Sequence, residues 1–278
     1  MINCLVKNWM TSPAVSVTPQ TTIVAAREFM SEQKIKTLLI AEKDQLLGVV
    51  TQRGLIRIDF SVLDEEVCDD SVDLSENKID CIMTRNPRIT QPDSSIPKAA
   101  RVMLENRIAA LPVVEDERLI GMLNSSDLMR FIIYACPLLE KEILVDQYMS
   151  DEIISIEPKT TLLEAHRITG VKRIRTLPVL ENDRLVGIVT RTDLVCSDPS
   201  RLASKEHQDL LLKILVQPVE KVMKKNLITI SPDAPIAEAA RLMMENVVHS
   251  LLVVDEDQKL VGVITESDLF LMIVQKFF

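Results

Sequence analysis

The octet GVITESDL, which spans Gly262 to Leu269, decides the fold because close variants of it occur three more times along the chain. The variants are GVVTQRGL from Gly48, GMLNSSDL from Gly121 and GIVTRTDL from Gly187. Each octet begins 38 or 39 residues after a methionine, and these methionines are Met10, Met83, Met149 and Met223. The chain therefore consists of four copies of one unit, in a repeat longer than that of most solenoid proteins.

The first copy shows the order of elements within the unit. AVSV, at residues 14–17, alternates like a short strand, and Thr18-Pro19 predicts a helix start, with a capping hydroxyl before proline. Apolar residues then follow at helical spacing, namely Ile23, Ala26, Phe29 and Met30. TLLIAE from Thr37 and LLGVVT from Leu46 predict a hairpin, and a second helix is expected after Thr51. Each copy is thus an α/β unit of the order β-α-β-β-α, entered through a short segment that ends at the methionine.

The four copies and the segments between them account for the whole sequence. We place the copies at residues 1–60, 79–136, 145–197 and 216–278, with connectors at 61–78, 137–144 and 198–215. The acidic run from about Asp59 to Lys78 is typical of a solvated loop. Pro137 is expected to end or kink the closing helix of the second copy.

The composition limits the class of protein. The chain has 278 residues, of which 47% are apolar and 26% charged, as in globular proteins. A net charge of -9 argues against binding to a nucleic-acid duplex, which needs a basic face. No apolar run approaches the length of a membrane span and the first residues do not resemble a signal peptide, so we expect a cytoplasmic protein. The five cysteines stand singly, which argues against a zinc site or a disulfide framework.

Patterns typical of enzymes are absent from the sequence. Four of the six glycines belong to the octets, so no phosphate-binding loop or dinucleotide fingerprint can be written. The three histidines, His166, His207 and His249, fall in different segments without metal-ligand spacing, and no G-x-S-x-G occurs. We therefore expect a non-catalytic protein with neither a catalytic cofactor nor a metal centre.

The octet places polar groups at the start of a helix. In the last copy Thr265 stands at the expected N-cap and Asp268 three residues later, where free N–H groups and the helix dipole favour a carboxylate. Helix capping alone would explain this pair. The first copy, however, has Gly54 in place of the aspartate and still reads as a helix. The aspartate is therefore not required by the helix alone.

A second repeated position carries positive charge. Twenty-six residues after each methionine, at the start of the second strand, stand Lys36, Ala109, Arg175 and His249. Three of these four can be cationic in a chain that is acidic overall. A solvated strand end and a contact to an anionic ligand both fit this position.

The whole pattern resembles the cystathionine β-synthase (CBS) domain. It combines an M-[TS]-x-x entry, h-P-V in the second strand and G-h-h-[TN]-x-[ST]-D-h at the end of the third. In that family two domains form a pair called a Bateman module, and two pairs can form a flat disc with pseudo-symmetry. The resemblance extends over nearly all of the chain. Four copies imply two modules, as in the γ subunits of AMP-activated protein kinase and in stand-alone microbial CBS proteins.

The resemblance implies adenine-nucleotide sites between paired copies. In the family the octet aspartate accepts hydrogen bonds from the ribose hydroxyls, which here implicates Asn124 with Asp127, Thr190 with Asp193 and Thr265 with Asp268. Phosphate contacts are expected from the partner copy. The implied pockets join Asp127 to Thr18, Lys36 and Thr37; Asp193 to Ser231, His249 and Ser250; and Asp268 to Arg175 and Thr176.

Two positions depart from the pattern. The remaining cleft pairs Gly54 with Ala109 and Ala110, so it is expected to be empty or weak. Glu157, before Pro158 beside the Asp268 pocket, stands where the family often has Thr or Ser. It is expected to cap the following helix rather than to repel phosphate.

The expected function is that of a regulatory protein that binds AMP, ADP or ATP and acts as an energy or nucleotide sensor on a separate, unidentified protein. S-adenosylmethionine is one alternative ligand, although it lacks the phosphate that Lys36, Arg175 and His249 would contact. A ligand-free structural scaffold is another alternative. Magnesium, diadenosine ligands and cyclic dinucleotides also stay open, as does the choice between a monomeric disc and a homodimer.

Overall fold

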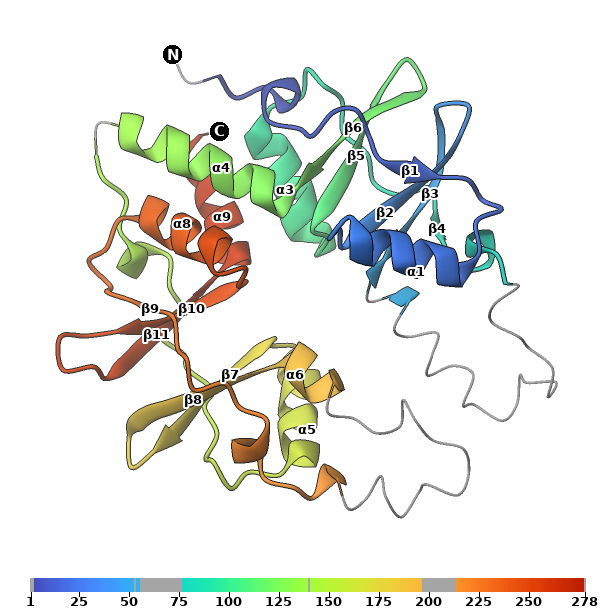
Figure 1. The fold of residues 1–278 in the computed structure, drawn as a ribbon. Helices are drawn as coiled ribbons and strands as arrows, with labels where there is room; N and C mark the ends of the chain where they lie inside the picture. Colours follow the sequence, from blue (N-terminus) through green and yellow to red (C-terminus); the bar gives the residue numbers. More distant parts are fainter. Residues whose placement is uncertain (1–2, 53, 56–76, 140, 197–213, 278) are drawn as a thin grey trace. The chain divides into compact units, whose positions relative to one another are not determined.

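The computed structural model describes residues 3–52, 54–55, 77–139, 141–196 and 214–277. Within these ranges copy 4 shows the full predicted β-α-β-β-α order (Figure 1). Copies 2 and 3 have an isolated parallel bridge in place of the first strand. Most of the closing helix predicted for copy 1 lies outside the described residues.

The chain divides into two compact units, Met1–Phe131 with Phe270–Phe278 and Ile132–Leu269. Copy 1 and copy 2 as far as Phe131 lie in unit 1, and copies 3 and 4, as far as the first turn of the last helix, lie in unit 2.

The copies share a helix followed by a hairpin. Copy 1 contains β1 (Ser16–Val17), α1 (Ile23–Glu32), β2 (Thr37–Glu42) and β3 (Gln45–Thr51). Copy 2 contains α3 (Ile96–Asn106), β5 (Ala110–Glu115), β6 (Arg118–Asn124) and α4 (Ser125–Ala135), and its entry segment forms the short strand β4 (Thr84–Arg85). Copy 3 contains α5 (Leu162–Lys172), β7 (Thr176–Glu181), β8 (Arg184–Thr190) and α6 (Arg191–Cys196). Copy 4 contains β9 (Thr229–Ile230), α8 (Ile236–Glu245), β10 (Ser250–Val254), β11 (Leu260–Thr265) and α9 (Glu266–Lys276). Four short 3-10 helices precede the repeated methionines, at Val6–Asn8, Ile79–Cys81, Val145–Gln147 and Val219–Lys221.

Each copy contains the expected hairpin in the same register. The second and third strands are antiparallel, and the octet glycine pairs with the same position of the second strand in every copy, as Gly48 with Ile40, Gly121 with Val113, Gly187 with Val179 and Gly262 with Val253. A β-bulge follows each of these pairs. The first strand is parallel to the second, with Ser16 opposite Leu39 in copy 1 and Thr229 opposite Leu252 in copy 4.

The start of the first helix in a copy differs from the prediction. Helix α1 begins at Ile23 and its cap is Thr22, whose Oγ1 accepts from the Ala25 N–H at 3.2 Å. Thr18-Pro19 instead opens a turn, which the Thr21 N–H closes on the Thr18 carbonyl at 3.1 Å. Proline is favoured at the second position of such a turn. The predicted cap at Thr18 was therefore wrong by one turn of chain.

The same turn corrects the expectation for Glu157. The Thr160 N–H bonds the Glu157 carbonyl at 3.0 Å, and Thr161 caps α5 by accepting from the Glu164 N–H at 3.2 Å. The exposed Glu157 lies before this helix and does not cap it. The prediction that Glu157 caps the helix was wrong because the proline-containing turn separates it from the helix start.

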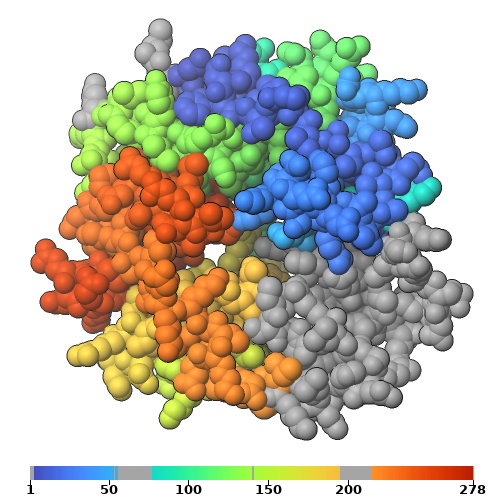
Figure 2. Space-filling view, viewed as in Figure 1, coloured from blue at the N-terminus to red at the C-terminus, as the bar shows by residue number. Residues whose placement is uncertain are grey.

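The entry segments are exchanged between the two copies of a pair. In unit 1, Thr11 and Met122 exchange two backbone hydrogen bonds of 2.9 and 3.0 Å, and β4 of copy 2 pairs with β3 of copy 1. In unit 2, Ser150 exchanges bonds with Val263, and Lys224 with Ile188. Figure 2 shows the dark blue entry segment of copy 1 lying directly on the green residues of copy 2. Each hairpin is thus extended at its third strand by the other copy.

This exchange explains the two residues that define the repeat. A Cβ on the octet glycine would lie 2.5–3.0 Å from the sulfur of the partner copy's methionine, which joins Gly48 to Met83, Gly121 to Met10, Gly187 to Met223 and Gly262 to Met149. Such separations are shorter than van der Waals contact, so a larger residue in place of glycine would force the methionine to shift. The periodic glycine and methionine are therefore two halves of one contact between copies.

The remaining predictions on the chain have mixed outcomes. Helix α4 ends at Ala135, and Pro137 lies in a 3-10 turn, as expected. Most of the acidic run at residues 59–78 and most of the connector at 198–215 lie outside the described residues. No helix in the described part of the chain is long and apolar enough to cross a membrane.

Candidate functional site

The octet residues form a cap at the start of each closing helix. In copy 4 the backbone N–H and hydroxyl of Thr265 both donate to Asp268 Oδ2, at 2.7 Å each. In copy 3 the same groups of Thr190 donate to Asp193 Oδ2 at 2.9 and 2.5 Å. In copy 2 the Asn124 N–H donates to Asp127 Oδ2 at 2.8 Å, and Asn124 Oδ1 accepts from the Asp127 N–H at 3.1 Å. The structure thus places the three predicted pairs in equivalent positions.

Copy 1, which has Gly54 in place of the octet aspartate, shows what part of the cap forms without the carboxylate. There the Gly54 N–H donates to Thr51 Oγ1 at 3.1 Å, so the hydroxyl half of the cap forms without an aspartate. A cap residue at this point satisfies one of the free N–H groups of the first turn. The carboxylates of the other copies are therefore additions to a cap that can form alone.

The three carboxylates differ in what faces their second oxygen. Asp127, whose side chain is 2% exposed, forms an ion pair with Arg130. Asp193, at 14% exposure, forms an ion pair with Lys224 of copy 4 at 2.9 Å. Asp268 is partly buried, and no cation of the described chain lies against it. Among the described octet carboxylates, Asp268 is therefore the one without a described cation beside it.

The pKa directions follow these surroundings. Burial raises the pKa of Asp268, and the bonds from Thr265 only partly offset it. Burial likewise raises the pKa of Asp127, against the opposing bonds from Asn124 and Arg130. For Asp193 burial acts in the same direction but is outweighed by Lys224 and Thr190, so its pKa lies below the ordinary value. All three carboxyls have ordinary pKa values near 4.

The basic position lies beside the octet of its own copy. The carbonyls of Lys36, Ala109, Arg175 and His249 accept from the first residue after the octet strand, which is Gln52, Ser125, Arg191 and Glu266 respectively. All four basic-position side chains are exposed. His249 Nδ1 also lies 2.9 Å from Glu266 Oε1. A basic residue at this position is thus close to the closing helix of the copy that carries it.

In unit 2 the two copies meet at the starts of their second strands. Thr176 Oγ1 and Ser250 Oγ lie 2.8 Å apart and share a hydrogen bond. Arg175 and His249 immediately precede these two residues, so the structure brings four of the predicted site residues to one junction between copies 3 and 4. Their assignment to a nucleotide stays a prediction.

Two predicted residues lie at the opposite end of the sheet from their expected neighbours. Parallel pairing places Thr18 level with Ala41, four residues along β2 from Thr37, or about 13 Å at the usual rise. Ser231 is level with Val254, and so lies equally far from Ser250. Thr18 is held by a 3.5 Å contact to Thr21, and Ser231 accepts from the Asp233 N–H at 3.3 Å. The structure therefore does not group Thr18 with Thr37, or Ser231 with Ser250.

Residues directly after the repeated methionines occupy the place beside the octet instead. They are Thr11, Thr84, Ser150 and Lys224, and each pairs with the third strand of the partner copy. Lys224 reaches an octet carboxylate directly. The M-[TS] repeat was visible in the sequence, but its spacing did not indicate which copy it would contact.

Replacement of Lys224 by Met tests the Asp193 ion pair. Because the folded-state pKa of Asp193 is depressed, the stability it contributes is present above about pH 4 and is lost as pH falls through the folded-state pKa. Lys224 is 62% exposed, so Lys224→Met is expected to cost at most about 1 kcal/mol at pH 7. Urea unfolding at several pH values measures this cost. A cost that persists unchanged at pH 2 would contradict an ion-pair origin.

The comparisons with known proteins agree on the family. The model of the CBS domain matches residues 6–61, 79–134, 145–197 and 219–274. A CBS domain-containing protein of Dictyostelium discoideum is 36% identical over 135 residues, which cover 48% of this chain and 93% of that protein. Protein MJ1225 of Methanocaldococcus jannaschii is 26% identical over 263 residues, which cover 91% of this chain and 93% of that protein.

Solved structures share the fold over nearly the whole chain. The crystal structure of MJ1225, described as a candidate archaeal homologue of g-AMPK, matches with a TM-score of 0.72 at 24% identity, over 96% of this chain and 99% of that one. An uncharacterized conserved protein from Pyrococcus horikoshii matches with a TM-score of 0.67 at 21% identity, over 97% of this chain and all of that one. From the four matched segments and the repeated unit, the chain belongs to the CBS-domain family and carries four copies of the domain.

Proposed function

We propose that this chain is a non-catalytic regulatory protein of the cytoplasm that binds an adenine nucleotide between paired copies and thereby controls a separate protein. The observation that supports this proposal is the Asp268 cap. One carboxylate oxygen is fixed by Thr265, while no described cation neutralises the group. A fixed carboxylate at a helix N-terminus can accept hydrogen bonds from the two hydroxyls of a ribose.

Residues around the unit 2 junction have the chemistry to bind the rest of a nucleotide. Thr176 and Ser250 supply hydroxyls, and the exposed side chains of Arg175 and His249 adjoin them. Arginine binds phosphate through a planar fork of donors. We therefore favour AMP, ADP or ATP over S-adenosylmethionine, which offers the same adenosine but no phosphate.

The proposal is tested by the melting temperature of the protein with AMP, ADP, ATP, adenosine and S-adenosylmethionine. A ligand at 100 times its dissociation constant adds about 2.7 kcal/mol to the stability of the folded state. For a chain of this length that corresponds to a rise of about 5 °C or more. We expect a rise with the nucleotides that exceeds the rise with adenosine.

Asp268→Ala supplies the control for the site. Because copy 1 forms its cap without a carboxylate, the variant is expected to keep the fold and lose most of the nucleotide-dependent rise. A rise with adenosine and S-adenosylmethionine alone would move the assignment to that cofactor. No rise with any ligand would favour the scaffold alternative and contradict the proposal.

A further inference from the structure

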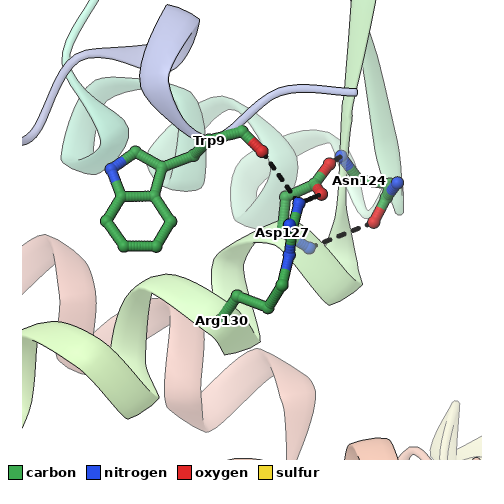
Figure 3. A network of polar contacts seen from close by, with 4 residues as sticks. All are labelled: Trp9, Asn124, Asp127 and Arg130. Carbon is green, nitrogen blue, oxygen red and sulfur yellow. Dashed lines mark hydrogen bonds and ion pairs between the residues drawn. The ribbon is translucent and has the colours of Figure 1, made fainter. Parts of the chain in front are cut away.

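Arg130 of α4 covers the octet carboxylate of copy 2 from within the protein. Its guanidinium forms an ion pair with Asp127 Oδ1 and donates to the Trp9 carbonyl at 3.0 Å (Figure 3). Trp9 belongs to the entry segment of copy 1, so one side chain ties the exchanged segment of one copy to the octet of the other. All of these residues lie in unit 1.

Both oxygens of Asp127 already have protein donors. The Asn124 N–H donates to Oδ2 at 2.8 Å and Arg130 occupies Oδ1, while only 2% of the side chain is exposed. A ribose would have to present its two hydroxyls to the same carboxylate. In the closed arrangement a cation lies on Oδ1 and the group is shielded, whereas both described donors to Asp268 come from Thr265 and lie on Oδ2.

The cover is held in place by the neighbouring residue. Phe131 follows Arg130 on α4 and packs edge-on against the Trp9 ring, with ring centroids 5.2 Å apart at 85°. The Trp9 indole N–H also donates to the Asn3 carbonyl at 2.8 Å. Trp9 is thus held at its ring and at its indole N–H, and its carbonyl accepts from Arg130 beside Asp127.

The other two octets that carry an aspartate lack this arginine. Three residues after Asp268 stands Leu271, and three residues after Asp193 stands Cys196. Copy 1 has Arg57 at the equivalent position, but it has Gly54 in place of the aspartate. In the sequence, an octet aspartate followed three residues later by an arginine therefore occurs in copy 2 alone.

We propose that Arg130 takes the place of the ribose in copy 2 and keeps the Asp127 cleft of unit 1 closed to nucleotides, so that unit 2 is the ligand-binding unit. This inference rests on the proposed function, because it assumes that the octet carboxylates are ribose acceptors. The sequence predicted three equivalent pockets, whereas this inference distinguishes an open site at Asp268 from a closed site at Asp127. Asp193 and its Lys224 belong to unit 2 and are not affected.

The test combines AMP titration calorimetry with the fluorescence of Trp9, the one tryptophan of the chain. Excitation at the red edge of indole absorption avoids the nucleotide. In the wild-type protein AMP is expected to release heat without changing Trp9 emission, and Asp127→Ala is expected to leave the number of sites unchanged. Asp268→Ala is expected to remove one site.

Arg130→Met is the opening variant, and Arg130→Lys is its control. Arg130 is 52% exposed, so Met can keep most of the stem packing while removing the cation. Met is expected to add one AMP site and to make Trp9 emission respond to AMP, whereas Lys, which keeps a cation near Asp127, is expected to add none. Retained melting temperatures without ligand show that both variants fold.

The outcomes separate the two proposals. A saturable change in wild-type Trp9 emission with AMP that Asp127→Ala abolishes would overturn the closed site. So would binding by the wild type with no extra site in Arg130→Met. If neither the wild type nor Arg130→Met binds AMP, the proposed function fails, and the ligand role of Arg130 fails with it.

Discussion

Gly121→Ala is expected to lower the free energy of unfolding by about 1–3 kcal/mol, the usual cost of overpacking a filled site. A Cβ at this position would lie 2.8 Å from the Thr11 carbonyl oxygen and 3.0 Å from the Met10 sulfur. The sulfur can move, but the Thr11 carbonyl is part of the backbone and accepts from the N–H of Met122, the residue next to Gly121 in β6. The methyl group must therefore displace the exchanged entry segment.

Gly170→Ala is the matched control. Gly170 lies inside helix α5, and a Cβ there would have no heavy atom within 4 Å. Alanine is the better helix former, so this variant is expected to gain up to about 1 kcal/mol. Denaturant unfolding followed by far-ultraviolet circular dichroism gives both values. Equal losses in the two variants would contradict the packing argument for Gly121.

The exchange shows how far the repeat could be read from the sequence. The octets and their spacing predicted the unit, its hairpin and its closing helix, because those features depend on local turn chemistry and on hydrophobic alternation. The spacing from Met149 to Gly187 is the same whether a methionine packs on its own copy or on the other one. In the structure Gly187 contacts Met223. Only a folded pair of copies makes this choice visible.

Local features of the candidate site were also predictable from the sequence, whereas its contacts between distant segments were not. The caps at Asp127, Asp193 and Asp268 followed from residues three apart, which are neighbours on any helix start. The parallel order of the first two strands, which periodicity does not reveal, places Thr18 and Ser231 four residues along the second strand from Thr37 and Ser250. Their part in a nucleotide site stays a prediction.

The charged partners of the carboxylates carried little signal in the sequence. Lys224 stands where the entry motif has Ser or Thr, and Arg130 is one charged residue on an amphipathic helix. Such residues are most often solvated. Their contacts depend on the exchange of the entry segments, which brings Trp9 beside Arg130 and Lys224 beside Asp193.

Phe131→Ala is expected to destabilise the protein most, by about 3–5 kcal/mol. Phe131 is fully buried, and its ring lies between Trp9 of the entry segment and Phe277 of the C-terminal residues, with centroids 5.2 and 5.0 Å away. Alanine would remove the shared partner of both aromatic contacts and leave a cavity among rings that cannot easily collapse. The ends of the chain would lose a common anchor in unit 1.

Tyr134→Ala provides the comparison on the same helix, because Tyr134 is an aromatic residue of α4 that is 60% exposed. It is expected to change stability by less than about 0.5 kcal/mol. Urea unfolding followed by far-ultraviolet circular dichroism gives the stability of both variants, and in Phe131→Ala the folded-state Trp9 emission is also expected to shift as the ring beside Trp9 is lost. A loss below about 1 kcal/mol in Phe131→Ala would contradict the anchoring role. It would also mean that Phe131 does little to fix Trp9, whose carbonyl accepts from Arg130 and so helps to hold Arg130 over Asp127.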